Sequence, residues 1–316
     1  MASKVLVVGG GGFIGSWLTK QLLDSKHKVT IIDPFVYYAD VDVKILDSVL
    51  KFRAKELLKG ARIIKSTYEK TGKRILKDFK PDVVIHLAAT PIEGSKNLEV
   101  NNRLILHDIS LTYKLAQDIA KSDVSKFIYM SSIFAYGNYT GWSVSENVGL
   151  NPHTLYGISK ATGEFIVKSL LEHKNWVILR TTSVYGFGDA NLRASQIFVN
   201  NALDSKSFWV NKDSWPDFIY VKDIVSGLER VMDSDIDHEV LHISGGHAVP
   251  LVDFVKELAK HFPKLDYEIK ENVDDRPRRG TMDNTKARVL LNWKPEFTLN
   301  RGIKDYLQYA KKAKHG

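Results

Sequence analysis

The 316-residue sequence contains no cysteine. Disulfide bonds, thiolate metal ligands and cysteine nucleophiles are therefore excluded. No apolar run approaches the roughly 18 residues that a membrane-spanning helix needs. The first strand-like segment begins at Lys4, which leaves no room for a signal peptide. We expect a soluble, cytoplasmic protein with no membrane partner.

Clusters of like charge are also missing, although the formal net charge is +8. The lysines are spread along the chain, which favours solvated helix faces over a nucleic-acid surface. A positive cleft for an acidic ligand, such as a diphosphate, is the alternative that this charge leaves open. Histidines show no metal-ligand spacing, and His86 lies inside an apolar run as a core residue would. The sequence predicts neither a nucleic-acid partner nor a catalytic metal.

The most informative segment lies at the start of the chain. The apolar run Val5–Val8 predicts a buried strand, and Phe13–Leu23 has the pattern of an amphipathic helix. Between them, Gly9, Gly12 and Gly15 follow the order G-x-x-G-x-x-G. Glycine lets the backbone approach a diphosphate at a helix N-terminus. The pattern indicates a dinucleotide site, with a plain turn as the alternative.

An acidic residue ends the next predicted strand, Val29–Asp33. A carboxylate here accepts hydrogen bonds from the ribose hydroxyls and repels a 2′-phosphate. Asp33 therefore favours NAD over NADP.

Predicted strands and helices alternate through the first part of the chain. This alternation is typical of an α/β fold with a doubly wound parallel (Rossmann) sheet, which binds ligands at the carboxyl edge of its strands. From about Phe187 the alternation loosens, and we expect a smaller C-terminal α/β lobe that binds substrate. The predicted division is an NAD-binding domain over 1–186, to which 217–246 return, and a substrate-binding lobe over 187–216 and 247–316. The strands are predicted at 5–8, 29–33, 61–65, 82–89, 126–132 and 176–180, and the main helices at 13–23, 73–79, 104–121 and 152–171.

Three polar residues at the predicted ligand edge suggest proton transfer. Tyr156 and Lys160 are four residues apart in a predicted helix, so they share one face. An ammonium beside a phenol lowers the phenol's pKa, which makes the tyrosine a competent general base. Ser132 ends a predicted strand and offers a hydroxyl to the substrate. The alternatives are a surface tyrosine covering a lysine stem, and a serine that bonds its own backbone.

Taken in order, these motifs resemble the extended short-chain dehydrogenase/reductases, and most closely the NAD-dependent nucleotide-sugar epimerase/dehydratase family, in its UDP-glucose 4-epimerase-like branch. The resemblance runs nearly end to end. It implies that Ser132, Tyr156 and Lys160 are catalytic. The motifs that carry it are Gly9–Gly15, Asp33, His86–Ala89, Ser131–Gly137, Tyr156–Lys160, Leu179–Gly186 and Asp217–Asp223. The implied cofactor-binding residues are Gly9, Gly12, Phe13, Ile14, Gly15, Asp33, Leu87, Ala88, Ala89, Tyr156 and Lys160.

The substrate side departs from the family pattern. Pro216 stands where the family commonly has an arginine that grips the diphosphate, and Asp108 and Ser183 stand where asparagine is frequent. A guanidinium fork matches a phosphate well, so other arginines are candidates to replace the missing one, with solvated loop charges as the alternative. The expected substrate-binding residues are Ser132, Ser183, Asn191, Arg193, Arg276 and Arg278.

The absence of an acid directly after Ser132 argues against dehydration. Relatives that dehydrate sugars usually carry acidic residues there, whereas this chain has Ile133, Phe134 and Ala135. We therefore predict an epimerase that oxidises a nucleotide-diphosphate sugar transiently at C4. A reductase of a 4-keto nucleotide sugar or other carbonyl, and a non-enzymatic nucleotide sensor, are the alternatives. The resemblance also implies a homodimer through a four-helix bundle built from 104–121 and 152–171.

Overall fold

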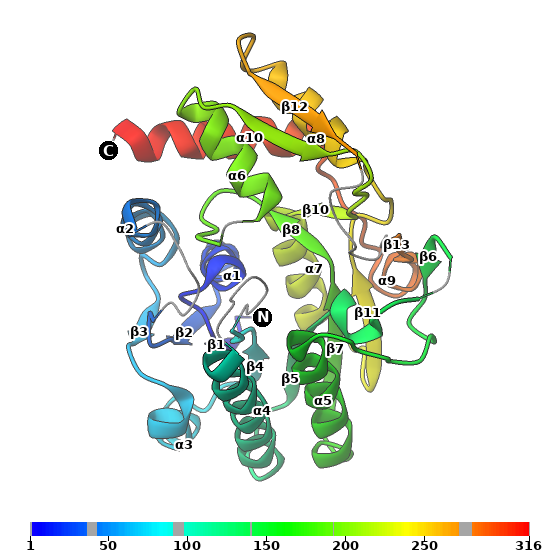
Figure 1. The fold of residues 1–316 in the computed structure, drawn as a ribbon. Coiled ribbons are helices and arrows are strands. Elements are labelled where there is room, and N and C mark those ends of the chain that lie inside the picture. The colour runs from blue at the N-terminus through cyan, green and yellow to red at the C-terminus, as the bar shows by residue number, and fades with distance from the viewer. Residues whose placement is uncertain are drawn as a thin grey trace.

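The computed structural model describes residues 2–36, 43–90, 98–139, 141–191, 193–271 and 280–315. Its centre is a seven-stranded sheet in the order β11-β7-β5-β4-β1-β2-β3, with each neighbouring pair parallel (Figure 1). This is the predicted doubly wound sheet, and the α/β fold class is confirmed. Its strands are β1 (Lys4–Val8), β2 (Lys28–Ile32), β3 (Arg62–Ile64), β4 (Val83–His86), β5 (Lys126–Ser132), β7 (Asn175–Thr181) and β11 (Glu239–Ile243).

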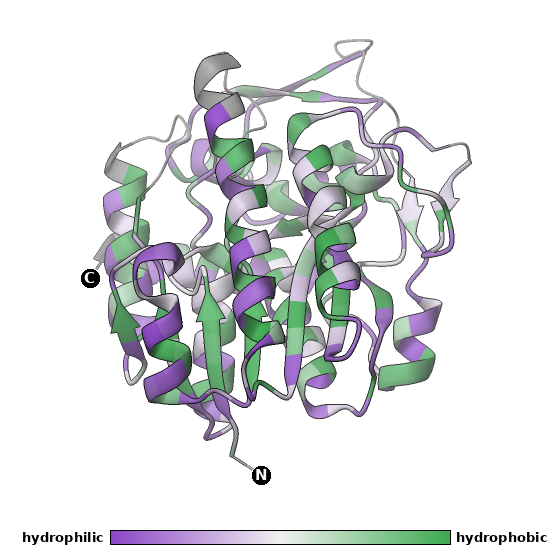
Figure 2. Cartoon of the chain, turned by 90° about the horizontal axis from the view of Figure 1, so that it is seen from below, coloured by the Kyte–Doolittle hydropathy of each residue, from purple (hydrophilic) through white to green (hydrophobic). Residues whose placement is uncertain are grey.

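The sheet is buried on both faces. Alternate side chains of a strand point to opposite sides, so each strand contributes to the apolar cluster on each face. In β1, Val5 and Val7 join one apolar cluster, and Leu6 and Val8 join another. The helices that cover the sheet carry apolar residues inward and polar residues outward, as the green and purple faces in Figure 2 show. The fold therefore has three layers, with the sheet in the middle.

Helices cover both faces of the sheet and continue into the second half of the chain. Their bounds are α1 (Phe13–Asp24), α2 (Val43–Phe52), α3 (Tyr68–Phe79), α4 (Leu98–Ala120), α5 (Leu155–Leu170), α6 (Ala194–Leu203), α7 (Val221–Asp233), α8 (Leu251–Ala259), α9 (Thr285–Leu291) and α10 (Leu299–His315), with a π-helical turn η1 (Arg53–Leu57) and a 3-10 turn η2 (Ile133–Tyr136).

Three of the helices begin elsewhere than predicted. Helix α3 begins at Tyr68 rather than at Lys73, and α4 begins at Leu98 rather than at Leu104. In contrast, α5 begins three residues after the predicted Pro152, because the Thr154 hydroxyl accepts a hydrogen bond from the Gly157 backbone N–H at 3.0 Å. Such a cap fixes the first turn of a helix, and here that turn carries Tyr156.

The second half of the chain adds short parallel pairs beyond the main sheet. Strand β10 (Phe218–Tyr220) pairs with β8 (Ser183–Tyr185), β12 (Tyr267–Lys270) with β9 (Phe208–Asn211), and β13 (Thr281–Met282) with β6 (Ser143–Val144). β11 returns to the main sheet and lies beside β7.

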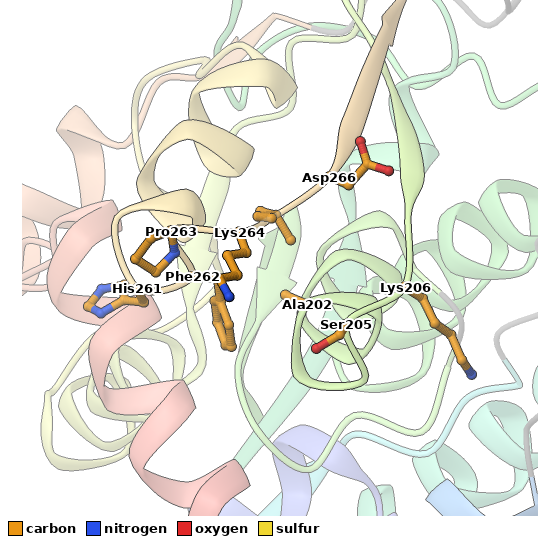
Figure 3. Close-up of a pocket in the computed structure, with 9 residues that line it drawn as sticks. Ala202, Ser205, Lys206, His261, Phe262, Pro263, Lys264 and Asp266 are labelled. Carbon is orange, nitrogen blue, oxygen red and sulfur yellow. The ribbon is translucent and has the colours of Figure 1, made fainter.

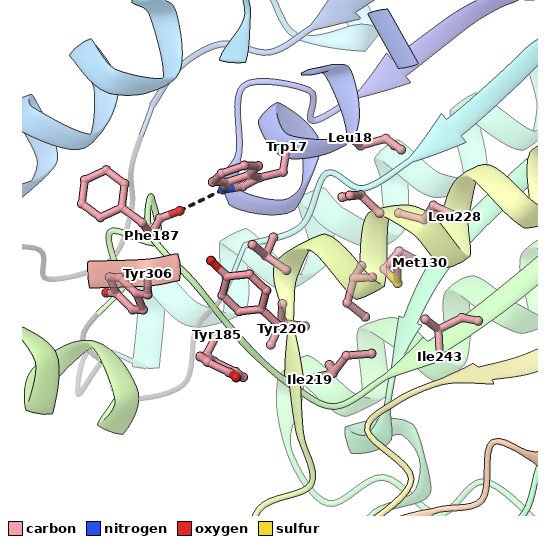
Figure 4. Packing of buried hydrophobic residues seen from close by; sticks show 14 of the residues in the cluster. Trp17, Leu18, Met130, Tyr185, Phe187, Ile219, Tyr220, Leu228, Ile243 and Tyr306 are labelled. Atoms are coloured by element: carbon pink, nitrogen blue, oxygen red, sulfur yellow. Dashed lines mark hydrogen bonds between the residues drawn. The ribbon is translucent and has the colours of Figure 1, made fainter. Parts of the chain in front are cut away.

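An aromatic core joins the two halves of the chain. Trp17 of α1 donates a hydrogen bond from its indole N–H to the Phe187 carbonyl at 2.8 Å, and Tyr185, Tyr220 and Tyr306 pack nearby (Figure 4). This packing fixes the chain after β8 against the first helix. Within the described residues, no helix has both the length and the apolar character that a bilayer span requires.

Candidate active site

The glycine loop is a tight turn against the end of β4. Gly9 has φ +86°, and a Cβ built on it would lie 2.5 Å from the Ala88 nitrogen. A Cβ on Gly15 would lie 2.2 Å from the Gly9 carbonyl oxygen. Both positions exclude other residues, since real side chains never approach backbone so closely. The turn thus presents bare backbone at the start of α1, which is the cradle that a diphosphate needs.

Asp33 lies beside this loop at the end of β2. Its carboxylate oxygens accept hydrogen bonds from the backbone N–H groups of Gly11 at 3.0 Å and Phe35 at 2.7 Å. Burial raises the pKa of this carboxyl, and the backbone donors together with the Arg53 charge oppose that rise. The acid therefore sits at the glycine loop, where the sequence predicts contact with the adenosine ribose. This position and the bare backbone of the loop both fit NAD.

Arg53 ties the glycine loop to a distant segment. Its guanidinium, in a side chain that is 1% exposed, donates to the carbonyl oxygens of Gly11 at 2.8 Å and Gly188 at 3.0 Å. No sequence motif points to Arg53. An arginine at the end of a charged helical stretch gives no local signal of burial, and its partners are backbone atoms far away in the chain.

Tyr156 and Lys160 meet on one face of α5, as their spacing predicts. The Lys160 ammonium lies 5.7 Å from the centre of the Tyr156 ring and donates to the Met130 carbonyl oxygen at 2.8 Å. Burial lowers the pKa of Lys160 to about 8, while the carboxylates of Asp108 and Glu164 raise it. Lys160 beside the phenol therefore loses its proton at a lower pH than an ordinary lysine does.

Ser132 ends β5 and caps the η2 turn. Its hydroxyl oxygen accepts a hydrogen bond from the Phe134 backbone N–H at 3.3 Å. The serine thus bonds its own backbone, but this bond uses only the oxygen, so the hydroxyl proton stays available to a substrate. The Phe134 ring lies 5.6 Å from the Tyr156 ring. The turn after Ser132 is thereby packed against the first turn of α5.

A buried ion pair between α5 and β7 lies next to these residues. Glu164, fully buried on α5, accepts two hydrogen bonds from Arg180 of β7, at 2.9 and 2.7 Å. The same carboxylate accepts a hydrogen bond from Ser131 at 2.6 Å. It therefore joins the ends of β5 and β7 to the catalytic helix. Glu164 is not among the predicted site residues, although it follows Tyr156 and Lys160 at the same spacing of four residues.

The other predicted cofactor residues border the same turn. Phe13, Ile14 and Leu87 are partly buried against the larger apolar cluster, and Ala88 against the smaller one. Ala89 follows in the segment after β4 and is half-buried.

Four of the six predicted substrate residues, Ser132, Ser183, Asn191 and Arg193, lie in the described part of the chain. Ser183 lies on β8, and its N–H donates to the Asp217 carbonyl at 3.2 Å. Asn191 and Arg193 both turn toward the buried Asp189, at 2.7 Å and 3.5 Å. A nearby carboxylate therefore competes with any phosphate for these two side chains. Arg276 and Arg278 lie outside the described residues.

A surface cavity and a buried histidine complete the description of the candidate residues. A surface cavity of about 310 Å³ opens between the ends of α6 and α8, where Lys206, Phe262 and Lys264 line it (Figure 3). It contains none of the predicted site residues. His86 is buried, and burial lowers its pKa to about 3, so it is a neutral core residue. Within the described part of the chain, no three His, Cys, Asp or Glu residues are placed to hold a metal ion.

Comparisons with known proteins agree with this geometry. The model of the NAD dependent epimerase/dehydratase family matches residues 5–243. The Bacillus subtilis (strain 168) protein YtcB, named an uncharacterized UDP-glucose epimerase, is 28% identical over 97% of both chains. A dTDP-D-glucose 4,6-dehydratase of Mus musculus is 25% identical over 99% of this chain and 90% of its own. The structure of a UDP-glucuronic acid 4-epimerase from Bacillus cereus, in complex with UDP-glucuronic acid and NAD, matches with a TM-score of 0.86 at 27% identity, over 98% of this chain and 99% of the other.

Proposed function

Since the chain belongs to the NAD dependent epimerase/dehydratase family, we propose that it is an NAD-dependent 4-epimerase of a nucleotide-diphosphate sugar. The observation that carries this proposal is that one fold contains both the glycine cradle and the Tyr156–Lys160 face of α5. The Bacillus relatives named above as UDP-sugar epimerases support the same reaction. Asp33 beside the cradle supports NAD, because its carboxylate would repel the 2′-phosphate of NADP.

The environment of Ser132 favours epimerisation over dehydration. Loss of a hydroxyl group as water requires an acid that protonates the leaving oxygen. The η2 turn instead follows Ser132 with Ile133, Phe134 and Ala135, none of which titrates. Epimerisation at C4 needs only proton transfer at one hydroxyl and a hydride that leaves and returns.

Each catalytic side chain has a proposed part in this reaction. NAD, when bound, supplies the hydride acceptor and donor. Tyr156 takes the proton from the sugar C4 hydroxyl and later gives it back, while the Ser132 hydroxyl hydrogen-bonds the same oxygen. Lys160 holds its positive charge beside the phenol and thereby stabilises the phenolate. The Met130 carbonyl orients that ammonium.

Replacing the proposed base tests this assignment. Tyr156→Phe keeps the ring that packs on Phe134 and removes the hydroxyl. We expect turnover of UDP-glucose or UDP-glucuronic acid to fall at least about a hundredfold, which is the usual contribution of a general base. NAD binding, measured by calorimetry, should stay close to that of the wild type. Tyr267→Phe, on β12, is the matched control; substantial turnover in Tyr156→Phe would refute the assignment.

A reductase is the second candidate, and the cofactor balance separates the two. An epimerase regenerates NAD in every cycle, so the absorbance of NADH stays constant and no added coenzyme is consumed. Net oxidation of NADH or NADPH with a carbonyl substrate would favour the reductase.

Further assignments complete the proposal. Ser183, Asn191, Arg193, Arg276 and Arg278 are proposed to bind the substrate. The cofactor part is proposed to comprise 1–186 and 217–246, and the substrate part 187–216 and 247–316. A homodimer through α4 and α5 and a cytoplasmic location are also proposed. Limited proteolysis with and without ligand tests the division into two parts. Light scattering tests the homodimer, and microscopy of a tagged protein tests the location.

A further inference from the structure

A buried arginine fastens an irregular segment on the substrate side of the fold. The segment 186–191 follows β8, contains neither helix nor strand, and is buried over 186–190. Buried main-chain carbonyl groups need hydrogen-bond donors. Arg53 supplies two of them to the Gly188 carbonyl oxygen, Nε at 3.0 Å and Nη2. The segment is therefore held by a side chain that comes from the proposed cofactor part.

The same guanidinium holds the glycine loop. Its Nη1 donates to the Gly11 carbonyl oxygen at 2.8 Å, and the Gly11 N–H donates to Asp33 at 3.0 Å. Arg53 is 1% exposed, so these backbone acceptors replace the water that its charge gives up on burial. One planar group with several fixed donors thus connects the proposed cofactor site to the segment 186–191.

A second contact runs between the same two regions. The Trp17 indole N–H donates to the Phe187 carbonyl oxygen at 2.8 Å, and the Phe52 ring packs edge-on against the Phe187 ring, with 4.7 Å between their centres. Trp17 lies on α1, directly after the glycine loop, and Phe52 precedes Arg53 in the chain. Two neighbouring carbonyl groups of the segment therefore take their donors from the cofactor part.

The segment in turn positions two of the proposed substrate residues. Asp189 follows Gly188 and is 3% exposed. Its carboxylate accepts hydrogen bonds from the Asn191 N–H at 3.0 Å and from Asn191 Nδ2 at 2.7 Å, and it lies 3.5 Å from Arg193 Nε. A contact that fixes Gly188 therefore also fixes the carboxylate that both side chains contact.

We propose that Arg53 is a positioning residue that couples occupation of the cofactor site to the order of the segment 186–191. When the glycine loop holds NAD, the Gly11 peptide is restrained, and Arg53 passes this restraint to the Gly188 carbonyl. A second ligand that binds the ordered segment loses less conformational entropy, so NAD and a nucleotide diphosphate favour each other's binding. The substrate side of this inference rests on the function proposed above.

Hydrogen exchange on peptides that cover 186–191 tests the coupling without any substrate. We expect NAD, at concentrations that saturate each protein, to slow exchange in this segment by about fivefold or more in the wild type. In Arg53→Met this slowing should be lost. Arg53→Lys serves if Arg53→Met does not fold, because a single ammonium keeps the charge but lacks the fork that reaches both carbonyl groups.

Lys126→Met is the matched control. Lys126 is also a buried cation, 6% exposed, and it donates to the Val231 carbonyl oxygen at 3.1 Å, but it begins β5 at the end of the strand away from Ser132. This variant should keep the effect of NAD on the segment. The proposal is overturned if NAD leaves the wild-type segment unchanged. It is also overturned if the segment exchanges faster in Arg53→Met but NAD slows it as in the wild type, since Arg53 would then only hold the segment in place.

Calorimetry with UDP separates this inference from the proposed function. UDP should bind the wild type about fivefold or more tightly with NAD than without it, and Arg53→Met should lose this difference. Absence of UDP binding in every protein would count against the substrate assignment. The exchange measurement needs neither UDP nor turnover, so it decides the role of Arg53 in that case as well.

Discussion

Lys160 combines burial with a positive charge, and this combination makes the site sensitive to pH. Burial lowers its pKa from the ordinary 10.5 to about 8, so the ammonium is lost as the pH rises through 8. Its proposed role requires the charged form. We predict that kcat falls above about pH 8, by roughly tenfold per pH unit once the neutral amine dominates. A rate that stays flat to pH 10 would contradict this.

The titration of Lys160 affects stability in the opposite direction to activity as the pH rises. Between about pH 8 and pH 10.5 the unfolded chain binds a proton at Lys160 that the folded chain does not. By linkage, the contribution of Lys160 to the free energy of unfolding then rises with pH across this window. Urea unfolding of the wild type and of Lys160→Met at several pH values should show a rise that the variant lacks.

Gly9 is a residue at which the cradle cannot accept even one added carbon atom without strain. An alanine there would adopt a left-handed conformation, at a cost of about 1–2 kcal/mol, and would also press on the Ala88 backbone. We predict that Gly9→Ala lowers the free energy of unfolding by at least that amount and weakens NAD binding at least about tenfold. Denaturation and calorimetry measure the two. Gly149→Ala, where a Cβ meets nothing within 4 Å, should change neither.

At the scale of elements, the Glu164–Arg180 pair joins α5 to β7. Glu164→Gln keeps the shape of the side chain but leaves the buried Arg180 charge without its carboxylate. Breaking such a pair costs about 3–5 kcal/mol, so we predict a loss of this size in urea unfolding. The exposed Glu172→Gln should stay within about 0.5 kcal/mol of the wild type. Equal stability of the two variants would mean that the pair contributes little.

Elements and local motifs were predictable to different degrees. The strand–helix alternation, the glycine loop and the pairing of Tyr156 with Lys160 were predicted because each depends on residues close in sequence. Arg193 shows the limit of such reasoning, because Asp189, four residues away, holds its side chain. The arginine's charge suggested a phosphate, but the local partner became visible only in the fold. The roles assigned to these site residues stay predictions.

At the scale of the whole molecule, α4 and α5 carry an apolar face that the other described residues leave open. Leu106 and Tyr113 are seven residues apart on α4, as are Ile158 and Phe165 on α5, and their exposed fractions are 67%, 47%, 40% and 61%. Exposed apolar patches of this kind mark protein interfaces. The spacing places each pair on one side of its helix.

We predict that Phe165→Glu converts the proposed homodimer to a monomer. A buried unpaired carboxylate in the interface would oppose association. Light scattering after size exclusion measures the mass directly. Val289→Glu, on α9 and 74% exposed, is the control and should leave the mass unchanged. A wild type that is monomeric at micromolar concentration would refute the dimer.

The long-range contacts could not be predicted from the sequence. Arg53 and Gly188 are 135 residues apart, and Trp17 and Phe187 are 170 apart. Each contact exists only because packing brings α1, the end of α2 and the chain after β8 together, and no local pattern encodes it.

The Arg53 bridge has a consequence for how this protein tolerates change. The acceptors at Gly11 and Gly188 are main-chain carbonyl groups, which every amino acid supplies. These hydrogen bonds therefore depend on the identity of Arg53 and not on the side chains of the two loops that it joins. Substitutions in either loop would leave these acceptors in place, whereas Arg53→Met would remove all of these hydrogen bonds at once.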